Sequence, residues 1–160
     1  MRNRGKYIGF LIIVIFIAIT SSCIKNESCL PANNLLTSQI YTVDDQSEIV
    51  EYKIDSMSLY IMGRPDTLYN NVEKVGQFTI PLSDSSNHLT ILLNLNDKQD
   101  TIWIDYIPFS VFRSTSCGII NRYEITNLNY TKNGIWYLYN QNNLIDENKG
   151  VNFYFFYRTI

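Results

Sequence analysis

The sequence predicts an all-β domain, a single β-sandwich of the immunoglobulin-like or a related kind, with a small β-barrel as the alternative. The 160-residue chain has 22 Ile and 12 Tyr but only two Ala. Ile and Tyr favour strands, whereas Ala is the best helix former. Short apolar stretches recur at a spacing of roughly 8–12 residues between turn residues, as in sandwiches and barrels. No stretch of helical length shows a helical period of hydrophobicity.

Each expected strand shows apolar alternation or β-rich composition, and turn residues separate most of them. In the first, Ile40 and Thr42 alternate with Tyr41 and Val43. Turns are expected at 63–66, 83–87 and 96–100, where Gly, Pro, Asn, Asp and Ser gather. The expected strands are 38–43, 49–54, 56–62, 67–70, 77–82, 89–95, 101–107, 109–116, 119–128, 135–139 and 151–157.

Four features refine this order. The nearly continuous apolar run 89–95 indicates a strand buried on both faces. Pro81 marks an edge or a strand end, and Pro108 separates two strands. The Asn-Gly pair within 131–134 predicts a hairpin between its flanking strands. The polar stretch 140–150 predicts a loop.

The N-terminal segment has the composition of an export signal. Arg2, Arg4 and Lys6 precede an apolar run at 8–19. That run is too short for a comfortable transmembrane helix, which needs roughly 20 residues, but it fits the apolar part of a secretory signal. We therefore expect residues 1–22 to be a signal peptide.

The residues after this run resemble a bacterial lipobox, Thr20-Ser21-Ser22-Cys23. The resemblance implies that Cys23 receives a diacylglyceryl group, that a peptidase cuts before it, and that its new amine is acylated. Several acyl chains together hold a protein firmly to a membrane. The alternatives are an anchor that is never cut, or a simple secretory signal with a free Cys23 thiol. Residues 23–37 are expected to be a tether and 38–160 the sandwich domain.

The charge of the mature chain excludes some partners. After a cut before Cys23, 10 basic and 15 acidic residues remain, a formal charge of −5. Such a domain is drawn neither to nucleic acid nor to anionic membrane surfaces. We expect no nucleic-acid partner, and a membrane contact made through lipid.

The remaining cysteines, Cys29 and Cys117, form an even pair in an exported chain, which predicts a disulfide. Two unpaired thiols are the alternative. The single histidine, His88, excludes a multi-His metal site and is expected to be a solvated residue at a turn or strand start. The acid pairs 44–45 and 146–147 are expected to be solvated turn residues; the alternative is that they bind calcium, with Asn148 adding an oxygen. Phosphate-loop, nucleophile-elbow and zinc motifs do not occur, so we expect no enzyme, cofactor or metal.

Two aromatic clusters are candidates for binding. Trp136, Tyr137 and Tyr139 form one, and 153–157 contains the other. On strands, about half of each cluster faces the core and half faces outward. Outward Tyr and Trp can stack on sugar rings or anchor a protein partner, so the first three are the predicted ligand-binding residues. The alternative is that these rings are covered, or simply decorate the surface.

Several motifs together resemble a family of uncharacterised small lipoproteins of Bacteroidota, a domain of unknown function. They are the lipobox, a cysteine six residues later, Ser114-Thr115-Ser116-Cys117-Gly118, Ile125-Thr126-Asn127-Leu128, two further segments (66–69 and 78–82) and the final aromatic strand. The resemblance covers nearly all of the mature chain. It implies an envelope location and paired cysteines, and no activity.

Two functions are therefore expected. The first is a non-catalytic lipoprotein of the cell envelope, anchored to the outer membrane on its periplasmic side or at the cell surface, that binds an envelope protein or serves an assembly. The second is a surface module that binds a glycan or another ligand.

Overall fold

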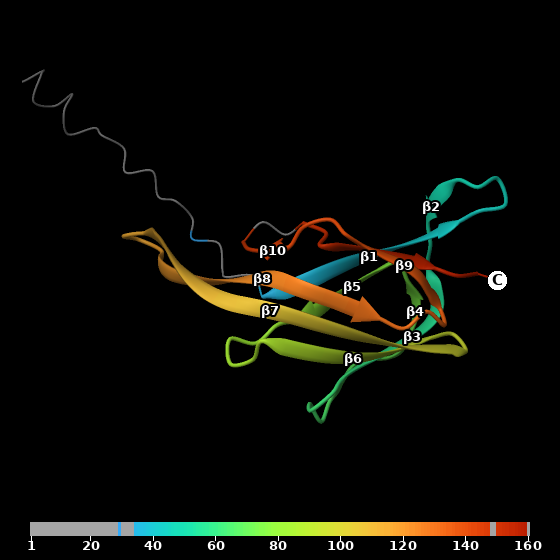
Figure 1. Cartoon of the computed structure of the whole chain (residues 1–160), viewed down its shortest axis with the longest axis horizontal. Coiled ribbons are helices and arrows are strands. Elements are labelled where there is room, and N and C mark those ends of the chain that lie inside the picture. Colours follow the sequence, from blue (N-terminus) through green and yellow to red (C-terminus); the bar gives the residue numbers. More distant parts are fainter. Residues whose placement is uncertain (1–28, 30–33, 148–149, 160) are drawn as a thin grey trace, which may run out of the picture.

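The structure is a computed structural model that describes residues 29, 34–147 and 150–159. Its described part is built from strands, and Figure 1 shows their arrangement. They are β1 (Leu35–Val43), β2 (Ile49–Glu51), β3 (Ile54–Ile61), β4 (Thr67–Val75), β5 (Gln77–Pro81), β6 (His88–Leu95), β7 (Lys98–Ser114), β8 (Gly118–Tyr130), β9 (Ile135–Asn140), β10 (Leu144–Ile145) and β11 (Phe153–Tyr157).

The strands form two sheets packed on each other, which confirms the predicted β-sandwich; neither sheet closes into a barrel. The five-stranded sheet has the order β2-β1-β11-β9, with β5 also paired to β1. The six-stranded sheet has the order β10-β8-β7-β6-β3-β4. β1 and β11 run parallel, so the first and last strands lie side by side at the centre of the five-stranded sheet.

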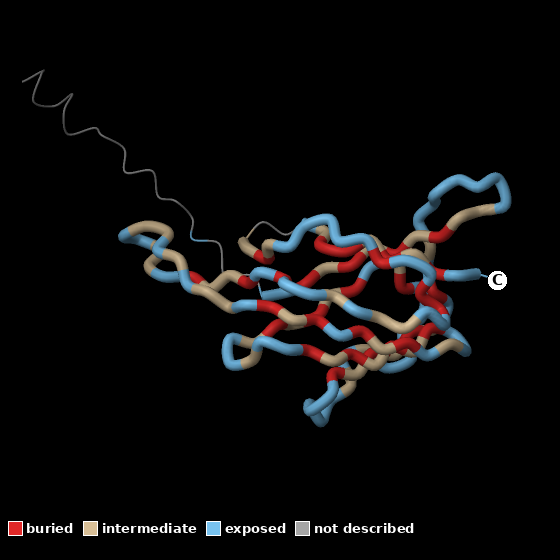
Figure 2. Tube along the Cα trace, viewed as in Figure 1, coloured by how far each residue is buried: buried red, intermediate tan, exposed pale blue. Residues whose placement is uncertain are grey.

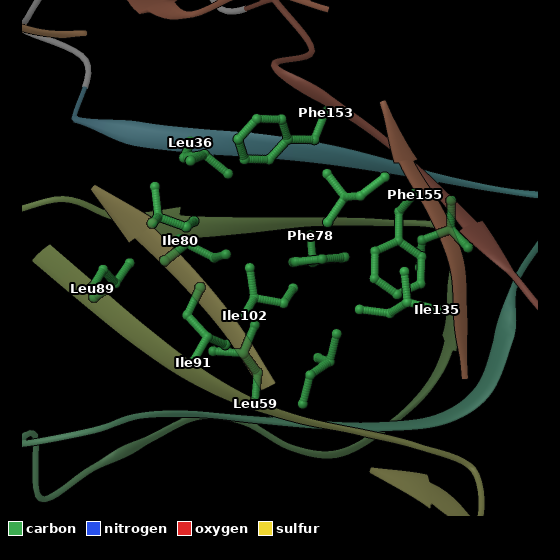
Figure 3. Close-up of a cluster of buried hydrophobic side chains, with 14 of the residues drawn as sticks. Leu36, Leu59, Phe78, Ile80, Leu89, Ile91, Ile102, Ile135, Phe153 and Phe155 are labelled. Atoms are coloured by element: carbon green, nitrogen blue, oxygen red, sulfur yellow. The ribbon is translucent and has the colours of Figure 1, made fainter. Parts of the chain in front are cut away.

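The core lies between the sheets and follows from period-2 alternation. β11 reads Phe-Tyr-Phe-Phe-Tyr, and its first, third and fifth residues are buried. Figure 3 shows Phe78, Phe153 and Phe155 of one sheet facing Leu59 and Ile91 of the other. Figure 2 shows buried positions alternating with intermediate or exposed ones along the strands. Each such side chain stabilises the fold by about 1.5–3 kcal/mol on full burial.

β1 begins at Leu35, ahead of the expected start at Ser38. Leu36 is fully buried and pairs with Ile80 of β5, so core packing recruits residues expected to be tether. The signal segment 1–22, Cys23 and most of the tether lie outside the described residues.

The expected strand 49–54 is wrong as a single element. The chain leaves the five-stranded sheet after Glu51 and enters the six-stranded sheet at Ile54. Between them, the Tyr52 N–H still donates to the Ile40 carbonyl, and the Tyr52 ring stacks on Tyr157. The crossing residues keep extended backbone, so the sequence pattern does not mark the change of sheet.

β4 continues to Val75 instead of ending at Asn70-Asn71. Asn71 and Lys74 have positive φ (53° and 58°), and the β3–β4 register shifts near Met57. Asn tolerates this left-handed conformation better than most residues. β4 is the outer strand of its sheet, where such irregularities discourage pairing with another chain.

β7 runs through Pro108, where a break was expected. The β6 partner ends at the His88–Asp105 pair, so β7 has only β8 beside it from there on. Proline is tolerated in such an edge position because its missing N–H removes no ladder hydrogen bond. β7 and β8 thus form one long hairpin that projects beyond the body of the sandwich (Figure 1).

β6 is buried on one face only, not on both as its apolar run indicated. Leu89, Ile91, Leu93 and Leu95 face the core, whereas the positions between them are partly covered. Leu92 is the apolar residue on that outer face.

The predicted Asn-Gly hairpin is also wrong. β8 and β9, on either side of the turn, belong to different sheets. Neither Asn133 nor Gly134 has a positive φ, which a two-residue hairpin turn requires. The segment crosses between the sheets, and its backbone N–H groups donate to the buried carboxylate of Asp100.

Candidate functional site

The outer side of the five-stranded sheet carries five rings, which we name the aromatic face: Tyr41, Tyr137, Tyr139, Tyr154 and Phe156. Strand register places them in two rows. Tyr41, Phe156 and Tyr137 are opposite one another across β1, β11 and β9, and Tyr154 is opposite Tyr139 in the next row. Their side chains share one side of the sheet because opposite residues on paired strands point the same way.

The rings form a continuous chain of contacts. Tyr139 stacks on Tyr154 with centroids 6.1 Å apart, and Tyr154 meets Tyr41 edge to face at 5.4 Å. Tyr41 lies 5.9 Å from Phe156, which lies 6.1 Å from Tyr137. Such pairs contribute about 0.5–1.5 kcal/mol beyond the area they bury. The five rings therefore hold one another in place on the sheet.

The margin of the aromatic face is polar. Gln39 is opposite Tyr154, and Glu51 is opposite Tyr41. Partial burial, followed by the nearby Glu51 carboxylate, raises the pKa of the Tyr41 hydroxyl. That hydroxyl therefore stays protonated and can donate a hydrogen bond to an acceptor on a bound molecule.

Trp136 lies away from this face, because alternation along β9 puts it on the other side from Tyr137 and a bulge keeps it out of the core. The β9–β11 register shifts between Phe156 and Tyr157, so Tyr157 pairs with Ile135 and Trp136 has no opposite residue. Trp136 instead lines a separate hollow of about 270 Å³ at the end of the sheet, together with Thr42, Val43, Asp44, Tyr157, Arg158 and Thr159.

Of the three residues predicted to bind a ligand, the structure brings two together. Tyr137 and Tyr139 lie on the aromatic face, each about half exposed, and Trp136 lies apart. Sequence reasoning missed Tyr41, which comes from a strand nearly a hundred residues earlier in the chain. The alternation along β1 predicts that Tyr41 points outward, but the sequence does not show that β1 pairs with β11 and so brings Tyr41 beside the other rings.

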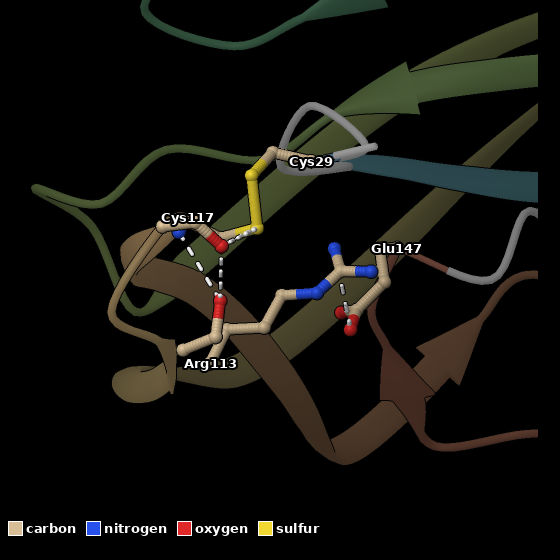
Figure 4. Close-up of a disulfide and its surroundings, with 6 residues drawn as sticks. Cys29, Arg113, Cys117 and Glu147 are labelled. Atoms are coloured by element: carbon tan, nitrogen blue, oxygen red, sulfur yellow. Dashed lines mark hydrogen bonds and ion pairs between the residues drawn. A yellow bond between two sulfur atoms is a disulfide. The ribbon is translucent and has the colours of Figure 1, made fainter. Parts of the chain in front are cut away.

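The disulfide joins Cys29 to Cys117, as the cysteine count predicts, with Cα atoms 5.4 Å apart. Cys117 lies in the turn of the β7–β8 hairpin, where its N–H donates to the Ser114 hydroxyl (Figure 4). Its sulfur is therefore in a covalent bond and is no nucleophile. The bond fixes the chain just before β1 to the tip of the hairpin.

An ion-pair cluster supports the same hairpin. Arg122 donates two hydrogen bonds to Glu147, at 3.1 and 2.8 Å, and the Arg113 guanidinium approaches the same carboxylate at 3.9 Å. Figure 4 shows Arg113 reaching toward Glu147. These bonds, above all those from Arg122, lower the pKa of Glu147. Glu147 is thus engaged in a structural pair rather than solvated, as had been expected.

A hydrogen-bonded chain of side chains lies on the outer face of the six-stranded sheet. His88, the first residue of β6, contacts Asp105 through Nδ1 at 2.6 Å and Thr90 through Nε2 at 3.0 Å. The hydrogen bond from His88 lowers the pKa of Asp105. The sequence of contacts from Asp105 through His88 to Thr90 resembles the acid, base and hydroxyl nucleophile of a catalytic triad. It lies on an exposed sheet surface where water competes for every contact, so we treat it as a surface network.

The other predicted acid pair caps a turn. The Asp44 carboxylate accepts the N–H groups of Gln46 and Glu48 between β1 and β2. Within the described residues, no group of three or more His, Cys, Asp or Glu side chains is placed to hold a metal ion. Over the same residues, the structure contains no helix long and apolar enough to span a membrane.

The fold and the site define a small β-sandwich with an aromatic outer face and a disulfide-bonded hairpin. Residues 53–157 match a family of unknown function, DUF6452, and the chain belongs to it. The match takes in β3 to β11 and therefore most of the aromatic face. No match was found among the curated proteins or among the solved structures.

Proposed function

We propose that this protein is a non-catalytic lipoprotein of the bacterial cell envelope, anchored by lipid on Cys23 to the outer membrane, whose aromatic face binds a protein partner. The observation that carries the binding role is the aromatic face itself. The outward positions of a sheet that covers a core on one face only are usually polar because they meet water. The core is already filled by the inward residues, so packing of the sandwich does not require these five rings.

The composition of the face favours a protein over other partners. Protein interfaces have centres rich in Tyr and poor in charge, surrounded by polar rims. Here four tyrosines and one phenylalanine form the centre, and Gln39 and Glu51 lie at the margin. The rings are also ordered by mutual contacts, which lowers the entropy lost on binding.

The lipobox supports the anchor, and the disulfide supports export from the cytoplasm. Disulfides persist in oxidising compartments such as the periplasm or the cell surface. Metabolic labelling with an alkyne fatty acid, followed by mass spectrometry of the N-terminal peptide, tests the anchor. The wild-type chain should carry label on Cys23, and Cys23→Ala should carry none. A wild-type chain that carries no label on Cys23 would contradict the proposed lipid anchor.

A photo-crosslinking residue at Tyr139 tests the partner face in intact cells, with the same residue at the exposed Asn129 of β8 as control. We expect one discrete protein adduct from position 139 and none from 129. The adduct should weaken when Tyr137 is replaced by Ala. Equal adducts from both positions would refute a specific face. Protease treatment of intact cells then assigns the side of the membrane, because only an external domain is removed.

A glycan is the second candidate, and the hollow beside Trp136 favours it. An indole next to Arg158 offers a flat surface for the C–H face of a sugar and a charged donor for its hydroxyls. A glycan array probed with the purified protein tests this role. Binding lost in Trp136→Ala would support it, and no binding at millimolar sugar would exclude it.

A further inference from the structure

The tip of the β7–β8 hairpin carries the most exposed apolar pair of the described structure. Phe112 and Ile119 are 68% and 71% exposed, higher than any other large apolar side chain that is described. They are opposite each other in the ladder and so share one face of the hairpin. Exposed apolar groups that gather in this way mark a contact surface more often than isolated ones do.

The surroundings of this pair are uncharged. Between Ser110 and Ile120, Arg113 is the one charged residue of the sequence. Its side chain is mostly covered, with only 21% exposed, and it is directed at Glu147. The turn that follows consists of small and hydroxyl residues. The tip therefore presents apolar and neutral polar groups, which suit the interfacial region of a bilayer.

The disulfide places this tip close to the point of lipid attachment. Cys29 is six residues after Cys23 and is bonded to Cys117 in the turn of the hairpin. At about 3.5 Å per residue, six residues reach no more than about 20 Å even when fully extended. Because the Cα atoms of Cys29 and Cys117 are 5.4 Å apart, lipid on Cys23 would hold the turn of the hairpin within about 25 Å of the membrane surface. The anchor thus keeps the tip at a high effective concentration near the bilayer, so a weak apolar contact is sufficient for the tip to dock on it.

We propose that Phe112 and Ile119 insert into the surface of the membrane to which Cys23 is anchored, so that the hairpin tip, and not a sheet face, is the membrane-facing end of the domain. The inference rests on the proposed lipid anchor. The phospholipid bilayer is the partner proposed for the hairpin tip, because the short chain between Cys23 and Cys29 and the disulfide to Cys117 bring the membrane surface close to the tip.

Tryptophan reporters test the contact in the lipidated chain, reconstituted in phosphatidylethanolamine and phosphatidylglycerol vesicles with or without brominated acyl chains. Phe112→Trp and Ile119→Trp place the reporter at the tip. Ile49→Trp is the matched control, since Ile49 is also apolar and 62% exposed but lies on β2, at the opposite end of the long axis (Figure 1). The native Trp103 and Trp136 give the background.

We expect bromolipid to remove fluorescence from both tip reporters and to leave the Ile49→Trp variant at the wild-type level. Equal quenching of tip and control reporters would overturn the inference while the anchor stands, provided the chain still floats with the vesicles. Failure of the wild-type chain to float would overturn the anchor and the inference together. If the emission of the tip reporters shifts with protein concentration but is not quenched by bromolipid, the tip contacts a second copy of the chain. That result would also overturn the inference.

Discussion

Asp100 offers the sharpest test of how the two sheets are joined. It lies near the start of β7 and is almost fully buried. One carboxylate oxygen accepts the Thr131 hydroxyl at 2.6 Å and the Asn133 N–H at 2.8 Å. The other accepts the N–H groups of Gly134 and Ile135 at 2.6 and 2.9 Å. This single side chain therefore accepts one hydroxyl and three backbone N–H groups of the crossing from β8 to β9.

Replacing Asp100 by Ala leaves these donors without an acceptor. The two N–H groups of Gly134 and Ile135 are buried, and each such orphan costs about 1–3 kcal/mol. We expect the free energy of unfolding to fall by about 4 kcal/mol, which is a large share of the roughly 5–15 kcal/mol by which a domain is stable. The melting temperature should fall by about 10–15 °C. Asp100→Asn keeps one acceptor oxygen but turns an NH₂ group toward two donors, so it should lose roughly half as much.

Thermal and guanidinium unfolding of the purified chains, followed by tryptophan fluorescence, measures the effect. Asp97→Ala is the control, because Asp97 is exposed in the neighbouring β6–β7 turn and should change stability by less than about 0.5 kcal/mol. If Asp100→Ala unfolds within that margin of the control, the carboxylate does not hold the crossing and the reasoning is refuted.

Three further outcomes are expected. Reduction of the disulfide, or Cys117→Ser, should lower stability by up to about 4–5 kcal/mol, because the bond closes a loop with a sequence separation of 88. Thermal melts with and without reductant measure this loss, and the Cys117→Ser variant should not respond to reductant. The pKa of Glu147 is lowered in the fold, so its pair with Arg122 stabilises the fold fully above the ordinary carboxyl pKa, and this stabilisation is lost as pH falls through the lowered value. In melts recorded from neutral pH downward, Glu147→Gln should therefore flatten the loss of stability below the ordinary carboxyl pKa. Phe78→Ala should cost about 3–5 kcal/mol in the same unfolding assay, because the ring is buried against Phe155.

The class of fold was readable because alternation is a local property. In β5 the buried Phe78 and Ile80 alternate with Gln77 and Thr79, and the printed sequence shows that period directly. The change of sheet between Glu51 and Ile54 was not readable, because an extended chain looks the same whichever sheet it joins. Pro108 misled for a related reason: whether a proline breaks a strand depends on which neighbours that strand has.

The Asn-Gly pair shows the limit of local signals most clearly. Its composition favours a two-residue hairpin, but the buried carboxylate of Asp100 supplies acceptors for an open crossing. Asp100 is more than thirty residues away in the sequence, so tertiary contacts override the local preference. In the same way, Tyr137 and Tyr139 could be named from composition, whereas the bulge that leaves Trp136 exposed instead of buried depends on the pairing of β9 with β11.

The two proposed surfaces have a geometric consequence for each other. The aromatic face covers the outer side of the five-stranded sheet, and the hairpin tip lies at one end of the long axis (Figure 1). If the tip rests on the bilayer, the long axis stands away from the membrane and the aromatic face is turned sideways rather than down. Lipid and partner then do not compete for the same residues. A partner that reaches this face would lie beside the domain along the membrane. The crosslink from position 139 should therefore persist when Phe112→Ser and Ile119→Ser together remove the apolar pair of the tip.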